Sequence, residues 1–300
     1  MSLRAETSQQ GPALGPAGLV LLGLICQEAG AGIAVTLFPQ AGAVGMVALR
    51  LGFSAVILLL VFRPRLPGRS AADWRTVLAF GLAFAVMNVV FYLSLTRLPL
   101  GAAVTIEYLG PLVLSVVVSR RASAWLWAVL ALAGVALLGR GGFDHLDPLG
   151  VLFALAAGVM WVAYILLSAR TGRHFDRLDG LAIAMAIGAI VTIPFGVVSA
   201  GPALFHPIVL LLGLAVAILS SAVPYGLELL ALRRLPAATF SILMSLAPAL
   251  AAIAGLLILQ QPLTILDAVA ILLVVVASMG AVRAADRSRR LRQTDVEPAP

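Results

Sequence analysis

Charged residues are scarce in this sequence, and lysine is absent. Only 11% of the 300 residues are charged and 62% are hydrophobic, with a mean hydropathy of +1.09. Soluble domains carry about 25% charged residues. A water-soluble chain of this length could not hide so much apolar surface. The composition therefore excludes a soluble globular protein and predicts a polytopic membrane protein.

Other absences narrow the function. The single cysteine, Cys26, excludes an intramolecular disulfide and a cysteine-based metal site. The sequence has no P-loop, no HExxH and no Cys/His cluster, so we expect no ATP-driven pump, no cofactor and no metal centre. No nucleophile–base pair lies in an apolar run, so we expect no enzyme. We also expect no separate signal peptide before the first apolar run.

Ten apolar runs are each long enough to cross a bilayer as a helix, which needs about 20 residues. A barrel is excluded because the runs do not alternate between apolar and polar residues. The predicted spans are residues 17–38, 43–62, 75–96, 100–119, 123–140, 148–169, 179–199, 207–232, 237–259 and 264–284.

Arginine clusters between these runs predict the orientation. If the N-terminus is inside, 17 arginines fall on the inner side and 2 on the outer side, Arg97 and Arg140. This bias places both termini in the cytoplasm. The clusters also account for the net charge of +7 without a nucleic-acid partner.

A repeated pattern divides the chain into halves. The stretch from Phe91 to Pro111 is echoed from Leu230 to Pro248, with Arg-Leu-Pro and the closing proline each offset by 137 residues. Five spans per half invert the second half relative to the first, as in many secondary transporters. A repeat that serves packing alone is the alternative. The predicted units are a cytoplasmic tail (1–16), a first repeat (17–140), a second repeat (148–284) and a second cytoplasmic tail (285–300).

Four ionisable residues lie deep in predicted spans, where charge is costly and usually functional: Glu28, Arg50, Glu107 and Glu228. Glu107 lies eight residues after Pro99, about 12 Å into the membrane. Pro111 cannot donate to the Glu107 carbonyl, so a carboxylate and a free carbonyl would together attract an ammonium group or a proton. The alternative is a structural ion pair between Arg50 and Glu107 or Glu28.

Other polar groups share helix faces with these residues. Pro224 frees the Ser220 carbonyl in the span that carries Tyr225 and Glu228, although Glu228 could instead lie at the cytoplasmic mouth. Arg50 is a structural partner or binds a substrate carboxylate. Asp267 lies near a span end and should be solvated. The predicted substrate-binding residues are Glu107, Asn88, Tyr92, Arg50, Trp161, Tyr164, Tyr225 and Glu228; the aromatic members could equally serve helix packing. The candidates for proton coupling are Glu28, Glu107 and Glu228, and the predicted helix breaks lie at Pro111, Pro224 and Pro248.

Several of these stretches resemble a known family. The runs 45–51, 88–94, 99–101, 107–111, 119–121, 213–220, 243–245 and 248–252 look like the EamA-type drug/metabolite transporter superfamily, and most like its threonine/homoserine exporters and YddG-type amino acid exporters. The resemblance implies ten helices in two inverted EamA repeats, an inner-membrane location and export of amino acids. Ala247 and Gln260-Gln261 stand where the family often has acids, so coupling would run through the three glutamates or be absent.

The expected function is therefore secondary export of amino acids, threonine- and homoserine-like and of broad range, by alternating access around a central cavity. The alternatives are export of another small metabolite or a cationic drug, facilitation without ion coupling, and a membrane scaffold or sensor. The expected partners are the substrate and the lipid bilayer, and we expect a monomer.

Overall fold

The computed structural model describes residues 14–65, 68–119, 122–138, 146–175 and 179–294, which form helices and connecting turns without a strand. In chain order the helices are α1 (Leu14–Thr36), α2 (Phe38–Phe62), α3 (Ala71–Leu95), α4 (Leu100–Glu107), α5 (Leu109–Ser119), α6 (Ala122–Leu138), α7 (Pro148–Thr171), α8 (Asp179–Ala200), the 3₁₀ helix η1 (Gly201–Phe205), α9 (Pro207–Ala217), the π-helix η2 (Ile218–Ala222), α10 (Val223–Leu232), α11 (Ala237–Met244), α12 (Ala247–Leu259) and α13 (Ile265–Thr294).

These helices confirm an all-α polytopic membrane protein. Within the described residues, nine helical stretches are long and apolar enough to span a membrane. A shorter apolar stretch, Trp125–Leu138 in α6, occupies the fifth predicted span. Large apolar side chains cover the outside of the bundle, such as Val198 (86% exposed) and Ile190 (72% exposed). Such a surface is stable against lipid tails and not against water.

Three of the spans are interrupted shortly before a proline. The span of Pro111 is divided into α4 and α5 at Tyr108, and the span of Pro248 is divided into α11 and α12 between Met244 and Ala247. The span of Pro224 contains the π-helix η2. A proline removes the hydrogen bond to the carbonyl four residues earlier and its ring crowds that carbonyl, so the distortion appears one turn upstream. The ends of α4 and α11 are 137 residues apart.

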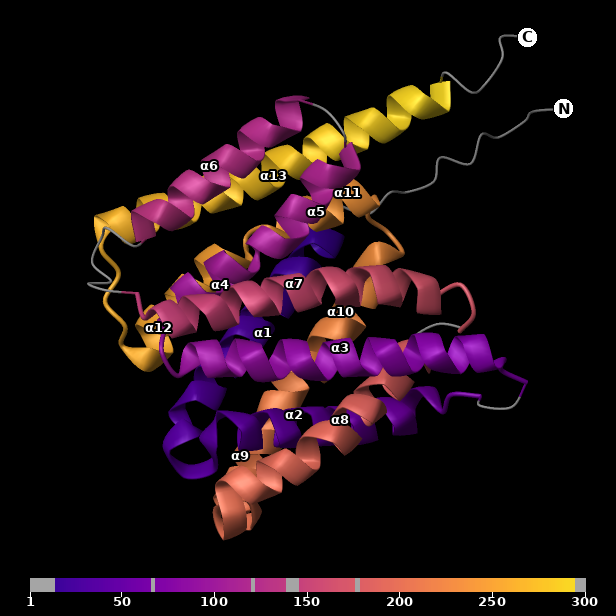
Figure 1. The fold of residues 1–300 in the computed structure, drawn as a ribbon, viewed down its shortest axis with the longest axis vertical. Coiled ribbons are helices and arrows are strands. Elements are labelled where there is room, and N and C mark those ends of the chain that lie inside the picture. The colour runs from indigo at the N-terminus through magenta and orange to yellow at the C-terminus, as the bar shows by residue number, and fades with distance from the viewer. Residues whose placement is uncertain (1–13, 66–67, 120–121, 139–145, 176–178, 295–300) are drawn as a thin grey trace, which may run out of the picture.

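Helices from the two parts of the sequence pack against each other. In Figure 1, α3 and α7 run side by side, and so do α6 and α13. The most extensive contact joins α2 and α8, while α1 packs on α10 and α12. The core therefore forms between helices of the first half of the chain and helices of the second half. A cavity in this core is lined by residues of both halves.

Some boundaries differ from the prediction. The helix α13 continues to Thr294, although the sequence predicted the end of the span at 284. The expectation that Asp267 is solvated was wrong, because its side chain is fully buried. Its Oδ2 accepts hydrogen bonds from the N–H and hydroxyl of Thr264, so it caps the start of α13. Several of the arginines counted for the orientation lie outside the described residues: Arg4, Arg120, Arg121, Arg140 and Arg177.

Candidate substrate-binding cavity

A central cavity lies where the interrupted helices face α1, α2, α3 and α7. Its empty volume is about 900 Å³, including its open side. Its lining residues come from seven helices and the α4–α5 break. They include seven of the eight predicted substrate-binding residues, Arg50, Asn88, Glu107, Trp161, Tyr164, Tyr225 and Glu228, together with Glu28. Residues as far apart in the sequence as Gln27 and Met244 thus face one space. This volume is within the usual range for small-molecule sites, about 300–1,000 Å³.

Arg50 is the one cation among the lining residues, and it is 8% exposed. Its Nη1 donates to the Tyr92 hydroxyl (3.3 Å) and its Nη2 to the Ser220 carbonyl (3.2 Å). This is the carbonyl that Pro224 leaves without its α-helical donor. The guanidinium also lies 5.6 Å from the centre of the Tyr92 ring. Polar and aromatic groups, not a carboxylate, therefore hold Arg50 in place.

The carboxylates of Glu28 and Glu107 lie in the same cavity, and neither has a hydrogen-bond or ion-pair partner among the described residues. Both residues are buried, at 3% and 9% exposure. In the part of the chain that the structure describes, no carboxylate oxygen lies within 4.0 Å of the Arg50 guanidinium. A structural ion pair between Arg50 and either glutamate is therefore not formed. Because the three side chains line one cavity, a ligand with both charges could reach all of them.

The helix break beside Glu107 presents two adjacent side chains to the cavity. In a continuous helix, neighbouring residues point about 100° apart, but both Glu107 and Tyr108 line the space. A Cβ on Gly158 would lie 2.7 Å from the Glu107 carbonyl oxygen, so α7 packs directly on this carbonyl. The carbonyl that Pro111 frees is therefore covered by α7. The Glu107 carboxylate, which lines the cavity, remains available to a ligand.

Aromatic rings form one wall of the cavity. Tyr108 stacks edge-on against Trp161 at 4.7 Å, and its hydroxyl donates to the Met244 carbonyl (3.0 Å). Tyr164 lies between Phe80 and Phe84, with ring centres 5.2 and 5.6 Å away. Such stacking fixes ring orientation while leaving apolar faces for a varied side chain.

Two polar residues of α3 have different positions. Asn88 faces the cavity, and its amide nitrogen donates to the Phe84 carbonyl one turn earlier (2.8 Å), so its oxygen remains available. Tyr92 is fully buried behind Arg50 and does not line the cavity. Sequence reasoning missed Gln27, Phe84, Met87, Val104, Tyr108 and Met244 as lining residues. For Tyr108 the signal was its position beside Glu107 in a proline-broken helix.

A second cavity continues from the first toward the ends of α7 and α10. Tyr164, Tyr225 and Glu228 line both cavities. The second also reaches Thr171 at the end of α7 and Phe175 in the turn that follows. Glu228 therefore lies between the central space and this end of the bundle, which is the predicted cytoplasmic side.

The opposite end of the bundle is held together by polar contacts. Arg97 Nη1 lies 2.7 Å from Asp147 Oδ2, which joins the turn after α3 to the start of α7. Asp147 also caps α7, and the Gly150 backbone N–H and the Arg97 side chain lower the pKa of its carboxyl. Gln261 Oε1 accepts from the Leu100 N–H at the start of α4 (3.0 Å). Gln261 thus caps the start of α4.

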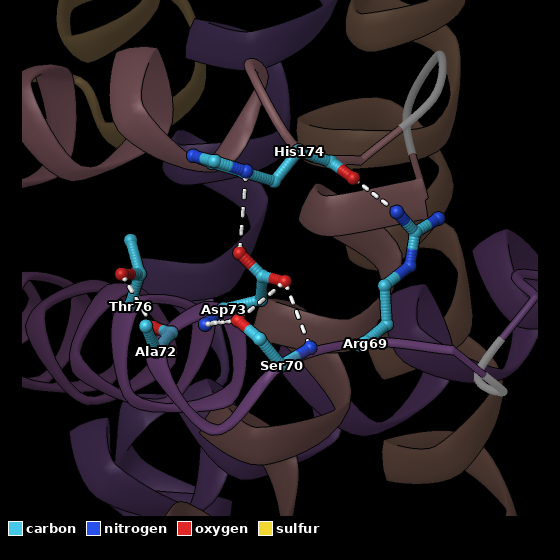
Figure 2. A network of polar contacts seen from close by, with 6 residues as sticks. All are labelled: Arg69, Ser70, Ala72, Asp73, Thr76 and His174. Carbon is cyan, nitrogen blue, oxygen red and sulfur yellow. Dashed lines mark hydrogen bonds and ion pairs between the residues drawn. The ribbon is translucent and has the colours of Figure 1, made fainter.

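A separate network ties α3 to the turn after α7, near the second cavity. Figure 2 shows His174 Nδ1 facing Asp73 Oδ1 at 3.3 Å, and Arg69 donating to the His174 carbonyl. Asp73 and Ser70 also form a capping box at the start of α3. The Arg69 guanidinium lies 4.6 Å from the Phe175 ring centre, so this network borders the lining of the second cavity.

Comparison with known proteins fits this geometry. A sequence model of the EamA-like transporter family matches residues 148–283. The threonine/homoserine exporter RhtA of Salmonella typhimurium (strain LT2) is 42% identical over 94% of this chain and 96% of its own length. The chain belongs to the EamA-like transporter family. The RhtA protein of Escherichia coli (strain K12) is 41% identical over the same shares.

Membership of this family makes the protein a membrane transporter and not an enzyme. A solved crystal structure covering 90% of this chain and 98% of its own chain shares the fold, with a TM-score of 0.58 at 19% identity. Among the described residues, no group of three or more His, Cys, Asp or Glu could hold a metal ion. The central cavity is therefore the candidate binding site for the transported molecule.

Proposed function

We propose that the protein exports threonine, homoserine and related amino acids across the bacterial inner membrane. The observation that carries this proposal is the placement of three buried charged side chains, Arg50, Glu28 and Glu107, in one cavity. The threonine/homoserine exporters that are 41–42% identical over nearly the whole chain support it.

The charges of the cavity suit a zwitterion. The Arg50 guanidinium would bind the substrate carboxylate through charge-assisted hydrogen bonds. Glu107, with Glu28 on the facing part of α1, would bind the ammonium group. Asn88 can accept a further hydrogen bond through its amide oxygen, and Trp161 and Tyr108 leave room for different side chains.

The two halves of the chain would be inverted repeats with both termini in the cytoplasm. Helix packing supports this architecture, because replacing each span with the one five spans away returns several of the most extensive helix contacts. The pair α3–α7 then corresponds to α10–α1, while α2–α8 and α6–α13 each correspond to themselves. The matched breaks at the ends of α4 and α11 agree with the same symmetry.

Transport would proceed by alternating access of the central cavity to the two sides. The second cavity beyond Glu228 would be the cytoplasmic route, and the contacts Arg97–Asp147 and Gln261–Leu100 would close the outer end. Outward opening would then require these contacts to break. Glu28, Glu107 and Glu228 are the candidates to carry a coupled proton, and uniport without coupling is the alternative.

A cationic drug or metabolite is the second candidate cargo. Three carboxylates and one guanidinium line the cavity, so its charge balance favours cations. A panel of zwitterionic and purely cationic solutes in proteoliposomes separates the candidates. Preference for cations that lack a carboxylate would favour the second.

Efflux of radiolabelled threonine from proteoliposomes tests the first proposal, at two pH gradients to detect coupling. We expect wild-type efflux to exceed protein-free leakage, Glu107→Gln to reduce it strongly, and Asn88→Ala to reduce it less. Full activity in both variants would remove the proposed site.

A further inference from the structure

Arg50 reaches the cavity from α2, and two anchors on other helices set the direction of its guanidinium. One is the Ser220 carbonyl in η2, 3.2 Å from Nη2. The other is the Tyr92 hydroxyl on α3, 3.3 Å from Nη1. Tyr92 is itself locked by ring contacts with Phe38 at 5.8 Å and Phe91 at 6.0 Å.

The Ser220 anchor depends on Pro224. In a regular α-helix this carbonyl would accept the N–H of residue 224, but proline has no N–H. The chain instead forms η2, where the Val223 N–H donates to the Ile218 carbonyl, one residue outside the α-helical register. A carbonyl buried here without a partner would be costly, and the Arg50 guanidinium supplies the donor.

The turn that carries Ser220 is tightly seated. Ser220 is 1% exposed, and a Cβ on Gly30 of α1 would lie 2.2 Å from its hydroxyl oxygen. The carbonyl anchor is therefore held by backbone packing between α1 and η2, which limits the positions open to Arg50.

The guanidinium retains unused donors. Of its five N–H groups, the two anchors take one on each Nη. Nε is buried and has no hydrogen-bond partner within the described residues. Arg50 also lines the cavity, and no carboxylate of the described residues lies within 4.0 Å of it. Its unused donors can therefore bind an anionic group.

We propose that Pro224 and Tyr92 are positioning residues, which orient the Arg50 guanidinium so that it binds the carboxylate of the transported amino acid. The inference rests on the proposed function, because it presumes a substrate with a carboxylate. It adds that a proline outside direct substrate contact determines recognition of that carboxylate. If the anchors only tied helices together, their loss would weaken binding of every ligand alike.

The test compares two ligands that differ in the carboxylate. Binding of L-threonine and of threoninol, which has the amine but no carboxylate, is measured on purified full-length protein. The variants are Pro224→Ala, which returns an N–H to the Ser220 carbonyl, Tyr92→Phe, which removes the hydroxyl anchor, and Arg50→Gln. Pro194→Ala is the matched control, because Pro194 lies inside α8 with an exposed side chain and outside the cavity lining.

We expect Pro224→Ala to weaken threonine binding about tenfold and Tyr92→Phe about three- to tenfold, as for the loss of a hydrogen bond to a charged group. Threoninol binding should stay within about twofold of wild type in both variants, and Pro194→Ala should change neither ligand. Equal losses for the two ligands, or unchanged threonine affinity, would overturn the inference. If Pro224→Ala does not fold, the ratio of threonine affinity to threoninol affinity in Tyr92→Phe decides the test.

Arg50→Gln separates failure of this inference from failure of the proposed function. If wild-type protein binds no amino acid, both fail. If wild type prefers threonine and Arg50→Gln loses that preference while Pro224→Ala and Tyr92→Phe keep it, the proposed function stands and the positioning role is wrong.

Discussion

The break between α4 and α5 and the break between α11 and α12 share a backbone design but differ in their chemistry. Each span divides into two helices before a proline, and the first helices end 137 residues apart. At the first break the last helical residue is Glu107, followed by Tyr108. At the second the corresponding residues are Met244 and Ser245. Glu107, Tyr108 and Met244 all line the central cavity.

The backbone breaks and the Glu107 carboxylate therefore have separate roles. A proline break opens space in the middle of a bundle, and both halves supply one. Of the two breaks, only the first supplies a carboxylate, so the breaks are chemically unlike although their backbone design is shared. A zwitterion needs unlike groups, because its ammonium would bind Glu107 while its carboxylate would bind Arg50.

The largest effect should come from a substitution that makes the first break resemble the second. Glu107→Met should lower threonine transport in proteoliposomes about 10- to 100-fold, because a charge-assisted hydrogen bond contributes about 1.5–3 kcal/mol. Asp286→Asn, an acid outside the cavity lining on α13, is the control and should transport normally. Transport by Glu107→Met within twofold of wild type would show that the charge difference is irrelevant.

A second variant tests how the first break is packed. Gly158→Ala would place a Cβ 2.7 Å from the Glu107 carbonyl, so we expect overpacking to destabilise the protein by about 1–3 kcal/mol. A lower thermal midpoint in detergent would report it. Gly226→Ala on α10 is the matched control, since nothing lies within 4 Å of its added Cβ. Equal midpoints for the two variants would contradict the close contact of α7 with this break.

The smallest effect should come from the contact that joins the two breaks. Tyr108→Phe removes the hydrogen bond to the Met244 carbonyl, a neutral bond that contributes about 0.5–1.5 kcal/mol. The KM for threonine should rise about two- to tenfold, with a smaller change in maximal rate. A loss as large as that of Glu107→Met would mean that Tyr108, and not the carboxylate, dominates recognition.

Much of this arrangement could be predicted from the sequence because membranes limit the choices. Apolar run lengths predict the spans, and buried charges such as Glu28 and Glu107 mark the cavity. Helical periodicity could not predict Tyr108, because its place in the lining depends on the break. The link from Arg50 to Ser220 joins residues 170 positions apart, which no local pattern encodes. The burial of Asp267 could not be predicted either, because an acid near a span end looks the same in sequence whether it caps the helix or faces solvent.

Equilibrium binding of radiolabelled L-threonine to purified wild-type protein and to Glu107→Gln tests the central claim most directly, with Asp286→Asn as the matched acid-to-amide control. The proposed site predicts that Glu107→Gln binds at least about tenfold more weakly than wild type, while Asp286→Asn binds as wild type does. Equal threonine affinity in all three proteins would contradict a site in which Glu107 binds the substrate amine.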